Sequence, residues 1–166
     1  MAGGNRSMGS QTPQTGSVGT IEVIVSALIL NPRGEILLIR QPKWGDTWTL
    51  PGGHLKPGER LCDGARREGE EETGLILTAR GLVDWGELID VDYRSRAFHF
   101  IYFDYAFSAE SSDVQLDPSE IAEGVWVAPS EVLSYQLTPG YRRTLERYLV
   151  SSDGPRDWAC RPDLTG

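Results

Sequence analysis

The sequence predicts an α+β domain, an α/β/α sandwich in which a mixed β-sheet is flanked by helices. Three observations support this fold class. Apolar, β-branched segments typical of strands recur along the chain, two segments have a helical pattern, and the two kinds interleave without a strict βαβ repeat. The chain has 166 residues, with 39% hydrophobic and 24% charged residues, which suits one soluble domain with one buried core.

The predicted domain covers residues 21–150. Residues 1–20 are rich in Gly, Ser, Thr and Gln and nearly lack apolar side chains, so we expect a disordered segment or, in part, an added leader. Residues 151–166 have the composition of a loose polar tail, in which Trp158 could attach to the domain.

The order of elements follows from apolar patterning and turn residues. Strands are expected at 21–30, 35–40, 48–50, 75–88, 97–106 and 124–127, with a hairpin turn at 31–34. A helix is expected over 60–73, with Gly74 as its left-handed C-terminal cap. A short helix should start at 129–131, and a last helix should end at Tyr148 with Pro139 at its first position.

Composition also excludes several classes of protein. No apolar run approaches the ~20 residues that span a bilayer, and the N-terminus lacks a signal-peptide layout, so we expect a cytoplasmic protein. Cys62 and Cys160 have no metal-ligand spacing and are expected to be free thiols in a reducing compartment. The net charge of -8 argues against binding to a nucleic-acid backbone.

The most informative segment is the predicted helix. At about 100° per residue, Glu68, Glu71 and Glu72 project within one sector, where like charges repel. Small and apolar residues form a separate face that can pack on a sheet: Leu61, Cys62, Ala65 and Gly69. A bound Mg²⁺ or Mn²⁺ would relieve the repulsion, because these ions prefer carboxylate oxygens and keep bound water.

A solvated acidic face is the ordinary explanation for a run of glutamates such as 70–72. Two flanking features favour a functional site instead. Residues 51–53 form a Pro-Gly-Gly turn beside the acidic sector, where backbone carbonyls could reach a metal. Arg67 follows Glu59 by eight residues, a spacing that allows an ion pair.

The segment resembles the signature of the Nudix hydrolase superfamily, Gly-x5-Glu-x7-Arg-Glu-U-x-Glu-Glu-x-Gly-U, where U is a bulky aliphatic residue. The matching positions are Gly53, Glu59, Arg67, Glu68, Glu71, Glu72, Gly74 and Leu75. One position departs from the signature, because Gly69 stands where the family has an aliphatic residue. We expect a large neighbouring side chain to fill the gap.

The resemblance implies Mg²⁺- or Mn²⁺-dependent hydrolysis of a nucleoside diphosphate linked to another group, by attack of water on phosphorus. It implies Glu71 and Glu72 as metal ligands and Glu68 as a ligand or as the group that orients the water. The Gly52 carbonyl is a further expected ligand, and Arg67 and Glu59 would hold the glutamates in place. One more carboxylate is expected from outside the signature: Glu120 first, Glu123 second, with surface charge as the alternative for both.

Candidate substrate-binding residues lie before and within the signature. Arg40 or Lys43 could bind a phosphate, Trp44 could stack on a base, and His54 could contact the substrate; packing is the alternative role of the aromatic residues and of His54. The resemblance favours a nucleotide sugar or ADP-ribose as substrate. The alternatives are a nucleotide-pool-sanitising hydrolase of (deoxy)nucleoside triphosphates and, in another class, a non-catalytic nucleotide sensor. No membrane or nucleic-acid partner is expected, and a homodimer is possible because dimers are common in the family.

Overall fold

The computed structural model describes residues 20–42, 45–89 and 99–151. Its strands are β1 (Ile21–Leu30), β2 (Ile36–Arg40), β3 (Trp48–Thr49), β4 (Gly52–His54), β5 (Leu77–Ile89), β6 (His99–Ala109) and β7 (Glu123–Val127). Its helices are α1 (Leu61–Thr73), the 3-10 helix η2 (Val132–Ser134) and α2 (Tyr141–Val150). The predictions for residues 1–19, 97–98 and 152–166 lie outside the described residues.

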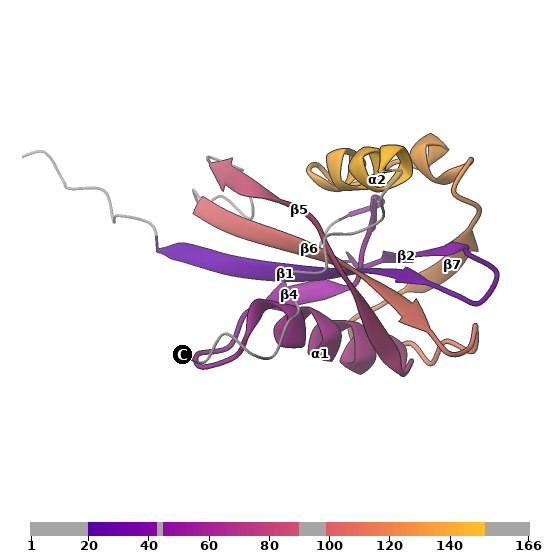
Figure 1. Cartoon of the computed structure of the whole chain (residues 1–166), viewed down its shortest axis with the longest axis horizontal. Coiled ribbons are helices and arrows are strands. Elements are labelled where there is room, and N and C mark those ends of the chain that lie inside the picture. Colours follow the sequence, from indigo (N-terminus) through magenta and orange to yellow (C-terminus); the bar gives the residue numbers. More distant parts are fainter. Residues whose placement is uncertain (1–19, 43–44, 90–98, 152–166) are drawn as a thin grey trace, which may run out of the picture.

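The described strands form one mixed sheet in the order β3-β2-β1-β6-β5, with β4 paired to β1 and β7 paired to β2. The β1 and β6 strands pair in parallel over ten residues, whereas the other pairs are antiparallel. The α1 helix covers one face and α2 covers the other (Figure 1). The predicted mixed sheet between helices is therefore confirmed.

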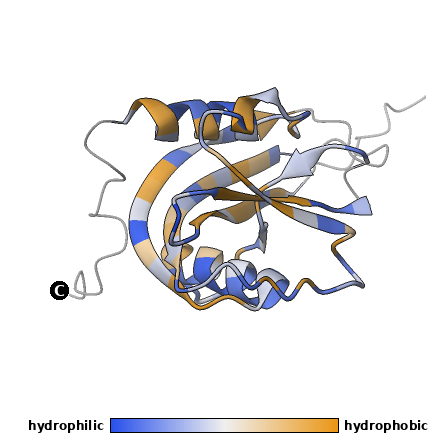
Figure 2. Cartoon of the chain, turned by 90° about the vertical axis from the view of Figure 1, so that its right-hand side faces the viewer, coloured by the Kyte–Doolittle hydropathy of each residue, from blue (hydrophilic) through white to orange (hydrophobic). Residues whose placement is uncertain are grey.

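Alternating side chains of β1 build a core on each face of the sheet. Val25, Ala27 and Ile29 pack with Cys62 and Ala65 of α1. Leu28 and Leu30 pack on the other face with Val132 and with Leu145 of α2. Figure 2 shows the sheet edge-on between the two helices. Because β1 is buried on both faces, its sequence is an almost continuous apolar run.

The α1 helix has the boundaries that the sequence predicts to within one residue. It ends at Gly74, whose φ of 67° is left-handed and whose N–H donates to the Glu70 carbonyl. Gly69 faces β1 and β5, and a Cβ added there would lie 2.7 Å from Leu77 Cδ1. Leu77 therefore fills the space left by the missing aliphatic side chain, as expected.

The predicted start of the last helix is wrong. The helix begins at Tyr141 after Gly140, so Pro139 is not its first residue. The reason is that Thr138 is bound to the sheet: its N–H donates to the Trp48 carbonyl at 2.8 Å, and its hydroxyl bonds that of Thr47. The chain turns into a helix only after this contact.

The prediction that Cys62 is a free thiol is also wrong, because Cys62 is disulfide-bonded in the structure. Spacing rules detect metal sites and frameworks of several cysteines, whereas a single bridge depends only on the proximity of two residues in the fold. Cys160 lies outside the described residues. Across 20–42, 45–89 and 99–151, every helix is too short or too polar to cross a lipid bilayer.

Candidate functional site

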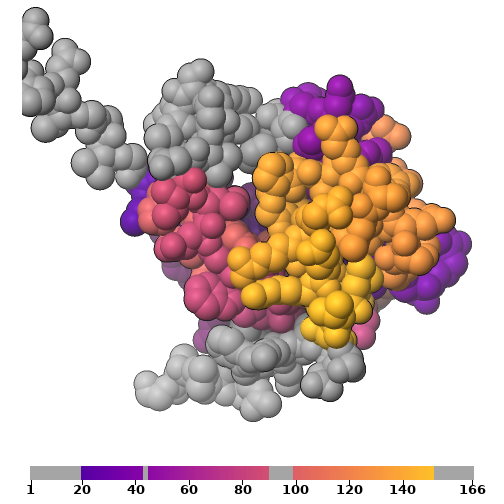
Figure 3. Space-filling model, turned by 90° about the horizontal axis from the view of Figure 1, so that it is seen from above, coloured from indigo at the N-terminus to yellow at the C-terminus, as the bar shows by residue number. Residues whose placement is uncertain are grey.

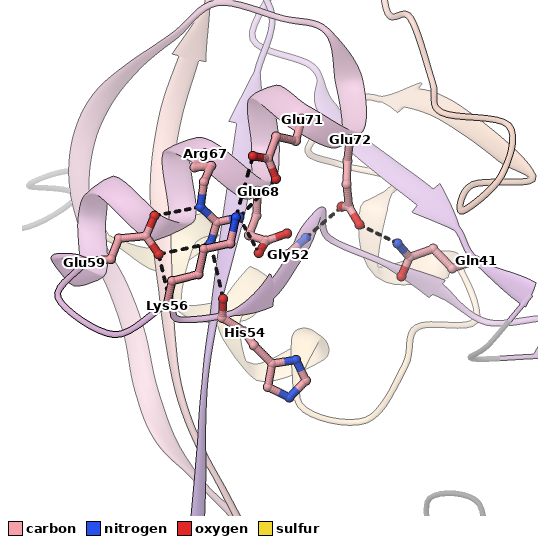
Figure 4. A network of polar contacts seen from close by, with 9 residues as sticks. All are labelled: Gln41, Gly52, His54, Lys56, Glu59, Arg67, Glu68, Glu71 and Glu72. Atoms are coloured by element: carbon pink, nitrogen blue, oxygen red, sulfur yellow. Dashed lines mark hydrogen bonds and ion pairs between the residues drawn. The ribbon is translucent and has the colours of Figure 1, made fainter.

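Arg67 on α1 is the centre of a polar network beside the Gly52–Gly53 segment (Figure 4). Its Nε donates to Glu59 Oε1 at 2.7 Å and its Nη2 to Glu59 Oε2 at 3.0 Å, so the pair is bidentate. Its Nη1 donates to Glu68 Oε1 at 2.7 Å and to Glu71 Oε2 at 3.0 Å. Its Nη2 also reaches the His54 carbonyl at 3.3 Å. One guanidinium thus connects three signature carboxylates to β4.

Glu59 lies before α1, where its Oε2 also accepts the Lys56 N–H at 3.1 Å. The hydrogen bonds from Arg67, and secondarily from Lys56, lower the pKa of Glu59 to about 2. The same contact with Glu59 raises the pKa of Arg67. Both groups are therefore charged at any physiological pH, and the predicted ion pair is present.

Glu72 is held separately from Glu68 and Glu71. It is buried, with 5% of its surface exposed. Its Oε2 accepts the Gly52 N–H at 2.9 Å, and its Oε1 accepts the Gln41 side-chain amide at 2.7 Å. Gln41 was not singled out by the sequence, because a glutamine after a strand belongs to no recognisable motif. Two separate segments therefore fix this carboxylate in one orientation.

Gly52 and Gly53 allow the close approach of β1 and α1 to the Pro-Gly-Gly segment. A Cβ on Gly52 would lie 2.6 Å from the Val25 carbonyl oxygen, and one on Gly53 would lie 2.6 Å from Glu68 Oε2. No side chain larger than hydrogen fits at either position without movement. The Pro-Gly-Gly segment thus lies directly against the carboxylates, as predicted, but Gly52 and Gly53 belong to strand β4 and not to a turn.

The donor set suits a hard divalent cation. Glu68, Glu71 and Glu72 offer only oxygen, and Glu68 Oε2 and Glu71 Oε1 are not among the atoms that Arg67 contacts. Within the described part of the chain, no three acidic, His or Cys side chains converge closely enough to hold a metal as they stand. Arg67, Gln41, Lys56 and the Gly52 N–H contact the carboxylates instead, so ligation would require these side chains to move.

The other candidate residues lie at different places around the sheet. Arg40 pairs with Glu123 at 2.7 Å and with Asp46 at 3.3 Å, and its guanidinium lies 5.9 Å from the Trp48 ring centre. His54 Nε2 contacts Glu22 at 2.6 Å, and its side chain is exposed. Lys43 and Trp44 lie outside the described residues.

The two carboxylates considered outside the signature differ in their surroundings. Glu120 is exposed in the turn before β7, where its N–H donates to the Asp117 carbonyl. Glu123 is engaged by Arg40. The preference for Glu120 stays a prediction, and its side chain is the less constrained of the two.

Comparisons with known proteins agree with this geometry. A family model described as the NUDIX domain matches residues 20–148. Nucleoside triphosphatase NudI from Escherichia coli O81 (strain ED1a) is 31% identical over 104 residues, which are 59% of this chain and 73% of the relative. The crystal structure of a MutT protein from Methanosarcina mazei Go1 superimposes with a TM-score of 0.61 at 30% identity, covering 78% of this chain and 94% of that one.

A likeness in fold alone extends to a UDP-X diphosphatase, with a TM-score of 0.61 at 23% identity over 81% of this chain and 64% of that one. The family model covers most of the chain, and the signature residues meet in space around Arg67. The chain therefore belongs to the Nudix family, whose members are pyrophosphohydrolases that act on acid anhydrides.

Proposed function

We propose that this enzyme hydrolyses the pyrophosphate bond of a nucleoside diphosphate linked to another group, of the nucleotide-sugar or ADP-ribose type. The observation that carries the hydrolase proposal is the Arg67 network, which keeps Glu68 and Glu71 beside the Gly52–Gly53 segment while Glu72 is fixed by Gln41 and Gly52. Such fixed carboxylates suit a reaction on a pyrophosphate when they hold a cation, because the cation offsets negative charge on the phosphate oxygens.

Enzymes of this family depend on a divalent metal, and we propose Mg²⁺ or Mn²⁺ here. Glu71 and Glu72 would hold the ion, with Glu68, the Gly52 carbonyl and Glu120 as further ligands. When bound, the ion neutralises charge on the pyrophosphate and lowers the pKa of its water. We propose that Glu68, whose Oε2 Arg67 does not contact, orients the attacking water and takes its proton. Glu59 and Arg67 are positioning residues, because they act through the glutamates.

Substrate binding is proposed for residues around the first hairpin. Arg40 stands between two carboxylates and beside the Trp48 ring, so a phosphate would have to compete with Glu123 for its guanidinium. His54 presents an exposed imidazole one residue after Gly53. Lys43 and Trp44 remain proposed contacts for a phosphate and a base on the strength of their sequence positions.

A second candidate substrate is a nucleoside triphosphate, including a damaged one. The observation that favours it is the 31% identity to a relative named as a nucleoside triphosphatase. A non-catalytic nucleotide sensor is the third candidate. The complete set of signature carboxylates argues against it, because loss of one or more of them would be expected in a sensor.

The test is a substrate panel with Mg²⁺ and with Mn²⁺ at neutral and alkaline pH, with phosphate release coupled to a phosphatase. It includes nucleotide sugars, ADP-ribose and nucleoside triphosphates. Glu72→Gln should abolish turnover and leave the fold intact. Glu70→Gln is the matched control, because Glu70 bonds the Leu77 N–H at 3.0 Å and a glutamine oxygen can accept the same bond. Turnover that survives Glu72→Gln, or tight ADP-ribose binding without turnover, would contradict the proposal.

Two further proposals concern the state of the protein. We propose a cytoplasmic location, where nucleotide derivatives are abundant, although the disulfide at Cys62 is typical of oxidising compartments. Fractionation of expressing cells tests the location.

A homodimer, implied by the family resemblance, is tested by light scattering coupled to size-exclusion chromatography.

A further inference from the structure

Four positions form a row straight across the sheet on the face that α2 covers. Gly52 of β4 is in register with Ser26 of β1, Ser26 with Asp104 of β6, and Asp104 with Asp84 of β5. Residues directly opposite each other on neighbouring strands point to the same face. Ser26, Asp104 and Asp84 are each at most 2% exposed. A buried polar row therefore leads from β5 to the Gly52–Gly53 segment.

The α2 helix lies over this row with polar side chains. Thr144 donates to Asp104 Oδ2 at 2.5 Å, and the Tyr141 hydroxyl bonds the Ser26 hydroxyl at 3.1 Å. At the β5 end, Arg143 and Arg147 both pair with Asp84. The space-filling view shows α2 spread over this face next to β5 (Figure 3). The α2 side chains thus bind three consecutive members of the row.

Asp104 differs from Asp84 in having no cation beside it among the described residues. Its Oδ2 is bound by Thr144, whereas its Oδ1 has no hydrogen-bond partner there. Burial raises the pKa of Asp104 to about 7, against the opposing hydrogen bond from Thr144. A buried carboxyl in this state costs stability that an apolar side chain of similar volume would not. Packing of α2 alone gives no reason for an aspartate here.

The other end of the row contacts Gly52 of strand β4. A Cβ on Gly52 would lie 2.9 Å from both Cα and Oγ of Ser26, so the two backbones touch at this point. The N–H of the same glycine donates to Glu72 at 2.9 Å. A shift of Ser26 therefore displaces the donor that fixes the Glu72 carboxylate.

We propose that Asp104 and Ser26 are positioning residues that anchor the Gly52 N–H, and through it Glu72, to helix α2. Asp104 bonds Thr144 and lies in register with Ser26 on the neighbouring strand, Ser26 bonds Tyr141, and the Ser26 hydroxyl lies against Gly52. The inference rests on the proposed role of Glu72 as a metal ligand. It assigns α2 a part in the reaction although the helix carries no signature residue.

The main test compares Asp104→Leu with Asp104→Asn in the full chain. Leucine removes the bond from Thr144 and keeps the branched shape of the side chain with two larger methyl groups, whereas asparagine keeps an oxygen acceptor and serves as the rescue variant. For Asp104→Leu we expect a fall in kcat and a rise in the Mg²⁺ concentration for half-maximal rate, each of roughly tenfold or more. We expect substrate KM to stay within about twofold. The Tm is measured alongside, because removal of a buried acid stabilises the fold whereas the larger leucine side chain overpacks the site. Asp104→Asn should recover most of the loss.

Leu145→Ala is the control for a purely structural role. Leu145 packs α2 on the same sheet face and is fully buried, but belongs to no polar contact of the row. Its Tm should fall while kcat and the Mg²⁺ dependence stay close to wild type at a temperature well below unfolding. If Asp104→Leu does not fold, Ser26→Ala is tested in its place. It removes one hydroxyl, and its kcat, KM, Mg²⁺ dependence and Tm are measured in the same way.

Wild-type kcat and Mg²⁺ dependence in Asp104→Leu, or in Ser26→Ala if that variant is needed, would overturn the inference. An equal loss of kcat and an equal change in Mg²⁺ dependence in Leu145→Ala would also overturn it. Glu72→Gln separates the two proposals: if it retains turnover the proposed function fails, whereas an inactive Glu72→Gln beside an unaffected Asp104→Leu refutes only the positioning role.

Discussion

Gly69 stands where the Nudix signature has an aliphatic residue. Its effect on the free energy of unfolding can be measured by substituting Gly69 and Leu77 singly and together. Gly69→Ala gains about 1 kcal/mol of helix propensity. It also places a Cβ 2.7 Å from Leu77 Cδ1 and 3.0 Å from Ala27 Cβ, and the second atom is held by the β1 backbone. Overpacking of this kind costs about 1–3 kcal/mol. We expect a net destabilisation of about 1 kcal/mol.

The same substitution should have the opposite sign in a Leu77→Ala background. Leu77 is 5% exposed, so its truncation alone should cost about 2–5 kcal/mol. The added methyl of Gly69→Ala then enters the space that Leu77 has left, and its helix propensity is gained with a smaller clash. We expect Gly69→Ala to stabilise this background, with a coupling of about 2 kcal/mol between the two positions.

Urea unfolding of the four proteins, followed by circular dichroism, measures all three differences. Equal m-values across the set are required for the comparison, since a changed slope would mean a changed unfolded or native state. If Gly69→Ala stabilises the wild type and the Leu77→Ala variant equally, Leu77 does not fill the gap and the account of the departure is wrong.

Two further predictions follow from the electrostatics of the site and the core. Arg67→Lys keeps the charge but loses the bidentate contact with Glu59, so we expect turnover to fall by roughly 10–100-fold with the fold retained; wild-type turnover would contradict this. Asp104 holds its proton in the native state up to a pH of about 7 and in the unfolded state only up to about 4. Native-state stability is therefore expected to fall as the pH rises across that window, by as much as about 4 kcal/mol, and to level off above it. In Asp104→Asn, the free energy of unfolding should no longer show this fall when it is measured from pH 4.5 to 8. A difference in that free energy between variant and wild type that stays constant across the range would refute the prediction.

The parts of the site that the sequence predicts are those whose spacing is local. Arg67 and the glutamates at 68, 71 and 72 lie within one helix, so their relative directions follow from helix geometry, and Glu59 lies shortly before that helix. The position of the Pro-Gly-Gly segment beside the acidic sector was also predicted, although the close approach of Gly53 to Glu68 was not. The strands followed from β-branched runs, although β6 extends to Ala109, beyond the predicted end.

The parts that were missed depend on register between distant segments. Gln41 meets Glu72 because β2 ends beside the C-terminal turn of α1, and nothing in either local sequence indicates this. The alternation in β6 places Asp104 on one face, but only the parallel pairing with β1 brings it beside Ser26. The start of α2 was misplaced because Thr138 bonds Trp48, a contact between residues 90 positions apart in the sequence.

The site's carboxylates differ in how firmly the fold holds them, and this difference orders the expected effects. Glu72 is buried and bound by groups from two segments, whereas the Glu71 side chain is 56% exposed and bonds mainly to Arg67. Loss of the hydrogen bonds from the Arg67 guanidinium therefore makes the Glu71 and Glu68 side chains more mobile, while Glu72 keeps its orientation. Residual turnover is expected in Arg67→Lys for that reason. None is expected in Glu72→Gln, because the lost charge belongs to the one carboxylate that the strands, and through Ser26 the second helix, hold in place.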